Sequence, residues 1–219
     1  MITYLVRIWL PDRPGALGQV ASRIGAVRGD VVGIEILERD GGQAVDELAV
    51  ALPDATLVNL LVQEIGQVEG VSVEDVRAVA GEPGDGRIDA LDTAARMVEA
   101  PNAGALLEVL VRDTVRELDA DWGLVVDLST QKALAEFGEW PAVDWLAAFI
   151  EGARHSDMVM AGHVGPEDIA FASLAAFGAE VVLGRRGRPF RTRERRQLIA
   201  LVRVANSTLD RLGWGIPAG

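Results

Sequence analysis

The sequence predicts an α+β protein built from two units, each with an antiparallel sheet. Short runs in which apolar and polar residues alternate predict strands, and stretches with apolar residues three or four positions apart predict helices. A segment with three Gly and one Pro, residues 81–86, separates two such sets. At 219 residues the chain is long enough for two ordinary domains. We therefore expect an N-terminal domain at 1–80, a linker at 81–86 and a C-terminal domain at 87–219.

The first eighty residues predict the order strand, helix, strand, strand, helix, strand. Alternating apolar residues place the strands at about 2–10, 31–38, 44–52 and 71–80. Pro14 suits the first turn of a helix, and the apolar positions Leu17, Val20, Ile24 and Val27 give that helix one apolar face; Leu57, Leu60, Leu61 and Ile65 do the same for the second. This order is the ferredoxin-like βαββαβ arrangement, an antiparallel sheet with both helices on one face.

The connection between the first strand and the first helix carries a family resemblance. The segment reads Leu-Pro-Asp-Arg-Pro-Gly-Ala-Leu-Gly-Gln-Val-Ala over residues 10–21, and the helix after it ends in Gly29-Asp30 before a strand that begins Val-Val-Gly-Ile. Together these features resemble the ACT domain, a regulatory module that senses amino acids. The resemblance covers residues 1–80, about a third of the chain.

This loop also has the chemistry that an amino acid requires. Free backbone N–H groups near Gly15, Ala16 and Leu17 are suited to a carboxylate, and Asp12 is suited to an ammonium group. The resemblance implies that the ligand lies between two ACT units, against the second strand of the neighbour. The expected ligand-binding residues are Asp12, Arg13, Gly15, Ala16, Leu17, Val32, Gly33 and Ile34. The alternative is that Asp12 merely caps the first helix and that the loop binds nothing.

The chain holds one recognisable ACT-like copy, so the pairing must come from a second chain. We expect a homodimer that acts as a non-catalytic regulator and ligand sensor, with an amino acid or a similar small molecule as its ligand. The alternative is an interaction scaffold that dimerises without a ligand.

The second unit predicts helices at about 88–98, 102–118, 141–153 and 193–212, and strands at 122–128, 132–137, 169–175 and 180–185. Its ending, from Val181 to Leu198, resembles that of a GAF-type sensor domain. The Asn-Lys and Phe-Asp-Glu residues that some members use for cyclic nucleotides are missing, as is the Cys that holds a bilin in others. We therefore expect a degenerate, structural GAF-like domain with an antiparallel sheet.

Composition narrows the possible functions further. The net charge of −12 disfavours nucleic acid as a partner, and zero Cys with two His disfavours a metal site. Adjacent carboxylates at Asp46-Glu47 and Glu74-Asp75 are expected to point to opposite faces of solvated strands, and the run His155-Ser156-Asp157 cannot form a relay. We find neither a phosphate loop nor a dinucleotide fingerprint. No enzyme activity and no cofactor are expected.

Two further expectations concern charge and location. A run of seven Arg in twelve residues can bind anions or RNA, but charge runs of this kind favour a solvated turn or a contact with acidic patches of another subunit. These residues are Arg185, Arg186, Arg188, Arg191, Arg193, Arg195 and Arg196. The first residues lack the pattern of a signal peptide, and no stretch of about 18 apolar residues occurs. We expect a cytoplasmic protein that does not enter a membrane.

Overall fold

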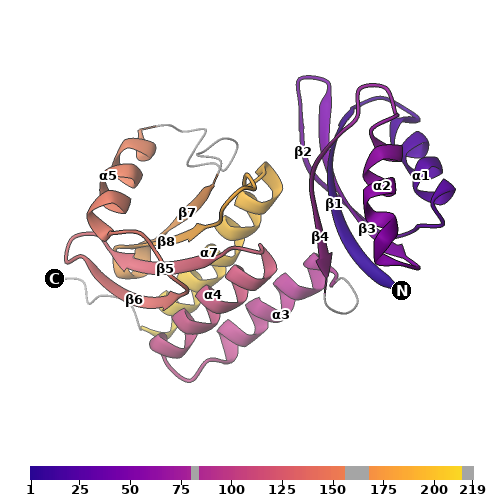
Figure 1. Cartoon of the computed structure of the whole chain (residues 1–219). Coiled ribbons are helices and arrows are strands. Elements are labelled where there is room, and N and C mark those ends of the chain that lie inside the picture. The colour runs from indigo at the N-terminus through magenta and orange to yellow at the C-terminus, as the bar shows by residue number, and fades with distance from the viewer. Residues whose placement is uncertain (80–83, 156–167, 214–219) are drawn as a thin grey trace. The chain divides into compact units, whose positions relative to one another are not determined.

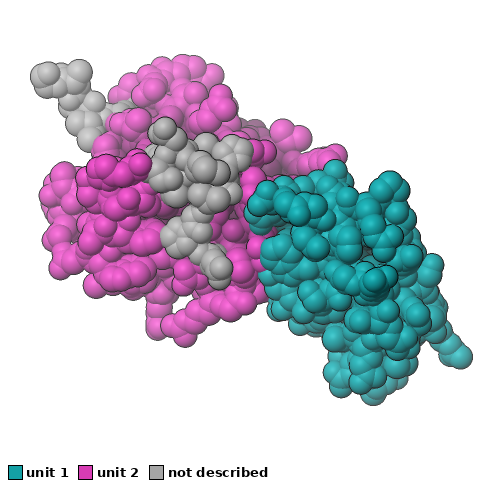
Figure 2. All heavy atoms as spheres, turned by 90° about the horizontal axis from the view of Figure 1, so that it is seen from above, with its two compact units in different colours: residues 1–84 teal, residues 85–219 magenta. Residues whose placement is uncertain are grey.

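The computed structural model describes residues 1–79, 84–155 and 168–213. Ser156, Asp157, His163 and part of the expected linker lie outside these residues. The chain divides into two compact units, Met1–Gly84 and Asp85–Gly219, which are coloured separately in Figure 2. Each unit has its own hydrophobic core.

Unit 1 has the expected order of elements. These are β1 (Ile2–Pro11), α1 (Ala16–Ala26), β2 (Asp30–Asp40), β3 (Gln43–Leu52), α2 (Val58–Ile65) and β4 (Ser72–Val79). The strands lie in the order β2-β3-β1-β4, and each pairs with its neighbours in antiparallel fashion. Both helices cover one face of this sheet (Figure 1). An α+β unit with an antiparallel sheet is therefore confirmed here.

The core of unit 1 lies between the sheet and the two helices. Every second residue of the central strands points into it, and the helices contribute residues at spacings of three and four. The buried side chains include Val6, Ile8, Leu10, Val20, Ile24, Leu48, Val50, Leu52, Leu61 and Ile65. Because β1 and β3 are central, their ends set the position of the loop before α1 and of the hairpin after β2.

The face of the sheet that carries no helix holds a cluster of charged residues. Arg7 on β1 is buried, and its Nε and Nη2 donate to Glu47 Oε2 at 3.1 and 2.9 Å. Arg77 on β4 donates to the same carboxylate at 3.2 Å and to Asp75 at 3.1 Å. These shared partners satisfy the buried guanidinium of Arg7, which would otherwise be costly to bury.

The expectation that Glu74 and Asp75 point to opposite faces was wrong. Trp9 donates from its ring nitrogen to Glu74 Oε1 at 3.0 Å, while Asp75 pairs with Arg77. The β1–β4 register shifts between Arg7 and Ile8, and such a bulge inserts a residue and interrupts the alternation of faces. Both carboxylates therefore reach partners on the helix-free face.

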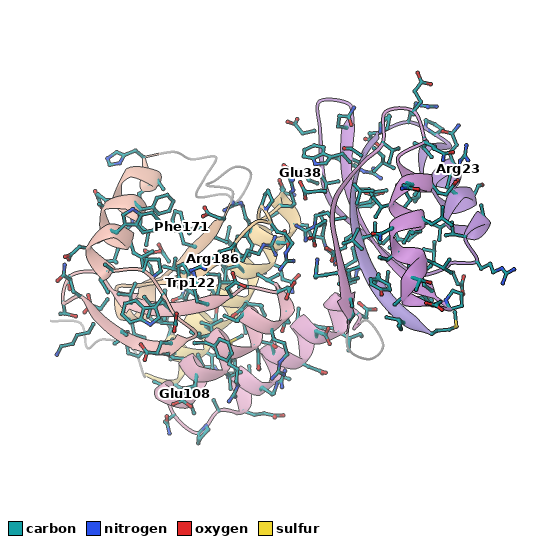
Figure 3. The ribbon with its side chains drawn as sticks, in the orientation of Figure 1. Arg23, Glu38, Glu108, Trp122, Phe171 and Arg186 are labelled. Atoms are coloured by element: carbon teal, nitrogen blue, oxygen red, sulfur yellow. The ribbon has the colours of Figure 1, made fainter. Side chains whose placement is uncertain are left out.

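Unit 2 is a second α+β unit built around one sheet. Its elements are α3 (Gly86–Glu99), α4 (Ala103–Glu117), β5 (Trp122–Asp127), β6 (Lys132–Phe137), α5 (Val143–Arg154), β7 (Ile169–Leu174), β8 (Ala179–Gly184) and α7 (Thr192–Leu212). The strand order is β6-β5-β8-β7, with antiparallel neighbours. Side chains of α3, α4 and α7 share a core with one face, and those of α5 with the other, where Trp122 and Phe171 lie (Figure 3).

Helix α3 turns several of its large apolar residues away from this core. Thr93 and Met97 are buried, whereas the apolar residues Ile88, Leu91 and Val98 are exposed. Two small residues beside the buried pair, Ala90 and Ala94, also pack against the core. Small side chains let α3 approach its neighbours closely, which the larger ones would prevent.

The interpretation of the Arg run as a solvated turn was wrong for two of its members. Arg185 is buried, and its two terminal nitrogens donate to the two carboxylate oxygens of Glu194, each at 2.8 Å. It also donates to the carbonyl oxygen of Leu118 at 2.6 Å and lies 4.0 Å from the ring centre of Phe190. Arg195, also buried, donates to the Phe190 carbonyl oxygen at 3.2 Å. Guanidinium groups with several donors can thus be buried where the chain turns and exposes carbonyl oxygens.

Among the described residues, no helix combines the length and the apolar character that crossing a membrane requires.

Candidate functional site

The loop between β1 and α1 is held against the hairpin that joins β2 and β3. The backbone N–H of Asp12 donates to the Gly42 carbonyl oxygen at 2.9 Å, and the N–H of Ala16 donates to the Arg13 carbonyl oxygen at 3.3 Å. Gly15 has a φ of 88°, a left-handed conformation that favours glycine. A Cβ at Gly15 would meet no atom within 4 Å, so the space beside this backbone is open.

Helix α1 begins without a side-chain cap, so the interpretation of Asp12 as the capping residue was wrong. Gly15 occupies the N-cap position, and no side chain accepts a hydrogen bond from the first turn. The N–H of Gln19 donates to the Gly15 carbonyl oxygen at 3.1 Å, but for the N–H groups of Leu17 and Gly18 the described residues supply no acceptor. Two donors at the positive end of the helix dipole are therefore available to an anionic group.

Asp12 lies near a cation from the neighbouring strand. Its Oδ1 is 3.9 Å from Nε of Arg39, near the end of β2, and both side chains are substantially exposed. An exposed pair at this distance contributes little free energy, roughly 0 to 1 kcal/mol. Asp12 and Arg39 can therefore exchange partners easily.

Asp46, in the middle of β3, is the feature of this region that sequence reasoning missed. It was expected on a solvated surface, but its exposed fraction is 4%, and its Oδ1 has no hydrogen-bond partner among the described residues. Burial raises the pKa of Asp46, the charge of Arg39 lowers it, and the charge of Asp12 raises it further. A polar residue at an inward position of an otherwise apolar strand face, between Ala44 and Leu48, was the signal that could have identified it.

The predicted residues of β2 lie on the edge of the sheet. Val32 and Ile34 are 50% and 48% exposed, and Ile36, two positions further, is 42% exposed. Gly33 lies opposite Ala49, whose Cβ is 3.4 Å from the position that a Cβ of residue 33 would take. β2 is therefore an edge strand that presents apolar side chains to solvent.

The structure brings together only part of the predicted site. Asp12, Arg13, Gly15, Ala16 and Leu17 lie on one continuous segment, where Ala16 is buried and Arg13 is exposed. Residues 32–34 lie in the half of β2 that pairs with residues 48–50 of β3, away from the hairpin that contacts the loop. Within one unit, the two sets of residues therefore do not form a single site.

The described residues offer little basis for a metal site or for a catalytic His. They contain no group of three or more His, Asp or Glu side chains suited to a metal ion. His155 ends α5, and its Nδ1 lies 2.9 Å from the Glu151 carbonyl oxygen, a local contact within the last turn of the helix.

Comparison with known proteins assigns no family. No protein-family model matches the chain. No curated protein matches it either.

Solved structures that resemble the chain include the ACT domain of a GTP pyrophosphokinase from Chlorobium tepidum, with 18% identity over 35% of this chain and 96% of that domain and a TM-score of 0.29. A formyltetrahydrofolate deformylase from Pseudomonas putida has 14% identity over 43% of this chain and a TM-score of 0.29, and the match spans 37% of the deformylase. An unknown protein from Galdieria sulphuraria has 12% identity over 97% of this chain and 94% of its own length, with a TM-score of 0.34. Likenesses at this level carry no conclusion about function.

Proposed function

We propose that the chain is a non-catalytic regulatory protein whose unit 1 binds an amino acid at an interface between two copies. The observation that carries this proposal is the exposed apolar edge formed by Val32, Ile34 and Ile36 on β2. Unit 2 is, in this proposal, a structural, GAF-like domain that dimerises or signals.

The edge of β2 supports pairing with a second copy. Open edges expose a row of backbone donors and acceptors, which pair readily with another strand, and sheet proteins usually protect such edges. Exposed β-branched residues add apolar surface that is removed from water on pairing, worth about 25 cal/mol per Å². Twofold symmetry would set β2 of one copy against β2 of the other and join the two sheets.

The uncapped start of α1 supports the binding of an anionic group. The N–H groups of Leu17 and Gly18 are free to donate, and the open space beside Gly15 gives a ligand access to them. A carboxylate is the anionic group of every amino acid, and a helix N-terminus favours it. The second copy would enclose the ligand with residues 32–34, which one unit by itself does not bring to the loop.

The proposal is tested by measuring the mass and the thermal stability of the full chain. We expect light scattering at micromolar concentration to give a dimer, and at least one of the twenty amino acids to raise the melting temperature. Ile34→Asp introduces a charge at the proposed interface and should give a monomer without this thermal response. Leu60→Asp is the matched control, because Leu60 on α2 is also an exposed apolar residue, at 42%. A wild-type monomer would contradict the proposal.

The second candidate function is a scaffold that dimerises through the same edge and binds no ligand. The exposed apolar edge of β2 supports it equally well, since pairing needs only this strand. A dimer whose melting temperature responds to none of the twenty amino acids would favour the scaffold.

A further inference from the structure

We infer that Asp46 is the acceptor for the ammonium group of the ligand, so that the site selects amino acids with a free amine. This inference rests on the proposed function and names the polar residue that gives it specificity. It assigns to Asp46 the role that sequence reasoning had given to Asp12.

The strand register places Asp46 on the face of the sheet that the helices cover. Asp46 pairs with Ile8 of β1 on one side and with Ile36 of β2 on the other. The residues two positions away on the same strand face, Ala44 and Leu48, belong to the core that α1 covers. Asp46 thus lies on the helix-covered face, toward the end of the sheet where the loop before α1 begins.

The groups that face Asp46 do not satisfy it. The charges that act on this carboxylate are those of Arg39, on the neighbouring strand, and Asp12, in the loop. These two side chains already form a pair at 3.9 Å, and neither hydrogen-bonds to Asp46 Oδ1, which is buried without a partner. A buried carboxylate oxygen normally has a partner, so this one is suited to a donor that the ligand would bring.

The loop and the strand then offer both halves of what a free amino acid needs. The N–H groups of Leu17 and Gly18 can take the carboxylate, and Asp46 can take the ammonium group. A ligand with its amine acylated would place a neutral amide against Asp46 and leave the Asp46 carboxylate without a charged donor. The expected ligand is therefore a free α-amino acid, and peptides blocked at the amine are rejected.

Asp12 is less suited to the same role. Its carboxylate is exposed and lies close to Arg39, so water and the guanidinium already compete for it. Hydrogen bonds between charged groups contribute more in surroundings that exclude water. Asp46, at 4% exposed, provides such surroundings.

The test uses the full chain and three variants that each remove one negative charge. These are Asp46→Asn, Asp12→Asn and the control Asp40→Asn, whose residue is exposed at the end of β2. The probes are an equimolar mixture of the twenty amino acids and the same mixture acetylated at the α-amine. The measurement is the concentration of each mixture needed for half of the maximal rise in melting temperature.

We expect the free mixture to stabilise the wild type and the acetylated mixture to have no effect. Asp46→Asn should raise the concentration required by roughly ten- to hundredfold, the change expected when a hydrogen bond between charged groups is lost. Asp40→Asn should match the wild type. Hydrogen exchange should show the ligand-dependent protection of residues 12–20 in the wild type and its loss in Asp46→Asn.

The possible outcomes separate this inference from the proposed function. An unchanged response in Asp46→Asn, or an equal response of the wild type to both mixtures, would overturn the role of Asp46 while ligand binding stands. No response of the wild type to the free mixture would overturn the proposed function and the inference together. Loss of the response in Asp12→Asn alone would return the ammonium site to Asp12.

Discussion

Replacing Asp46 with Asn should make unit 1 more stable at neutral pH. The substitution keeps the shape of the side chain and removes its negative charge. Asp46 is 4% exposed, and its Oδ1 has no hydrogen-bond partner among the described residues. Leaving a buried polar group unsatisfied costs about 1 to 3 kcal/mol, and a charged group costs more than a neutral one. Because Asn is itself polar, we expect a net gain of about 1 kcal/mol, which is roughly a fivefold change in the unfolding equilibrium.

The gain should depend on pH in a direction that the structure fixes. Burial raises the pKa of Asp46 in the folded state, so the folded protein binds a proton more tightly than the unfolded chain does. The wild type therefore becomes more stable as the pH falls through the folded-state pKa toward the ordinary value for Asp. Asn cannot take up this proton, so the advantage of Asp46→Asn should be full above the raised pKa and should shrink below it.

Hydrogen exchange of the full chain is the appropriate assay, because it reports on residues 1–79 separately from unit 2. Amides of β1 and β3 should exchange about fivefold more slowly in Asp46→Asn at pH 7, and less than that at acidic pH. The matched control is Asp40→Asn, which removes an exposed charge and should change stability by less than about 0.5 kcal/mol. Faster exchange in Asp46→Asn, or a gain that does not vary with pH, would refute the reasoning, since it would mean that the ionised carboxylate is satisfied in the folded state.

Two further predictions concern unit 2. Arg185→Met should lower the free energy of unfolding of unit 2 by about 3 to 5 kcal/mol in denaturant titrations, because it removes the cation that pairs with the buried carboxylate of Glu194. The control Arg186→Met, at an exposed residue, should change it by less than about 0.5 kcal/mol, and equal effects of the two variants would show that the buried pair contributes nothing. Gly184→Ala should lower the free energy of unfolding of unit 2 by about 1 to 3 kcal/mol, because the new Cβ would lie 2.1 Å from the ring of Trp122. Gly152→Ala, in α5 with no atom within 4 Å, should instead stabilise by about 0.5 to 1 kcal/mol, and thermal melts that reverse this order would contradict the packing described for β8.

The order of elements and the core of each unit were determined by local sequence patterns. Alternation of apolar and polar residues predicted β1 and β3 as strands, and apolar spacings of three and four predicted α1 and α4 as helices. In α4, the apolar residues Leu107, Leu110 and Val111 lie at helical spacing and are all buried, and Asn102 caps the helix by accepting from the N–H of Ala105 at 2.9 Å. These features depend on periods of 2 and 3.6 residues and on capping groups, which neighbouring residues specify.

The placement of charges was decided by the tertiary structure. Arg185 stands in a run of charged residues that suggested solvent, and Asp46 is itself charged, yet both are buried, because chain turns and strand pairing bring distant segments together around them. The direction of the Glu74 side chain was also decided by tertiary structure, since a bulge in the pairing of β4 with β1 turns it toward Trp9. Long-range pairing decided the burial of Arg185 and the direction of Glu74, whereas for Asp46 the apolar residues on the same strand face already carried a local signal.

Part of the candidate site was predictable from the sequence, and part of it depends on the tertiary structure. Its loop was identified from residues 12–17, whose Pro and Gly fix the start of α1 within a few positions of sequence. The unpaired N–H groups and the open space beside Gly15 follow from how that loop is held against the hairpin at Gly42. The position of Asp46 on the helix-covered face, buried and without a partner for Oδ1, depends on the register of β3 between β1 and β2, which is set only when the whole sheet has formed.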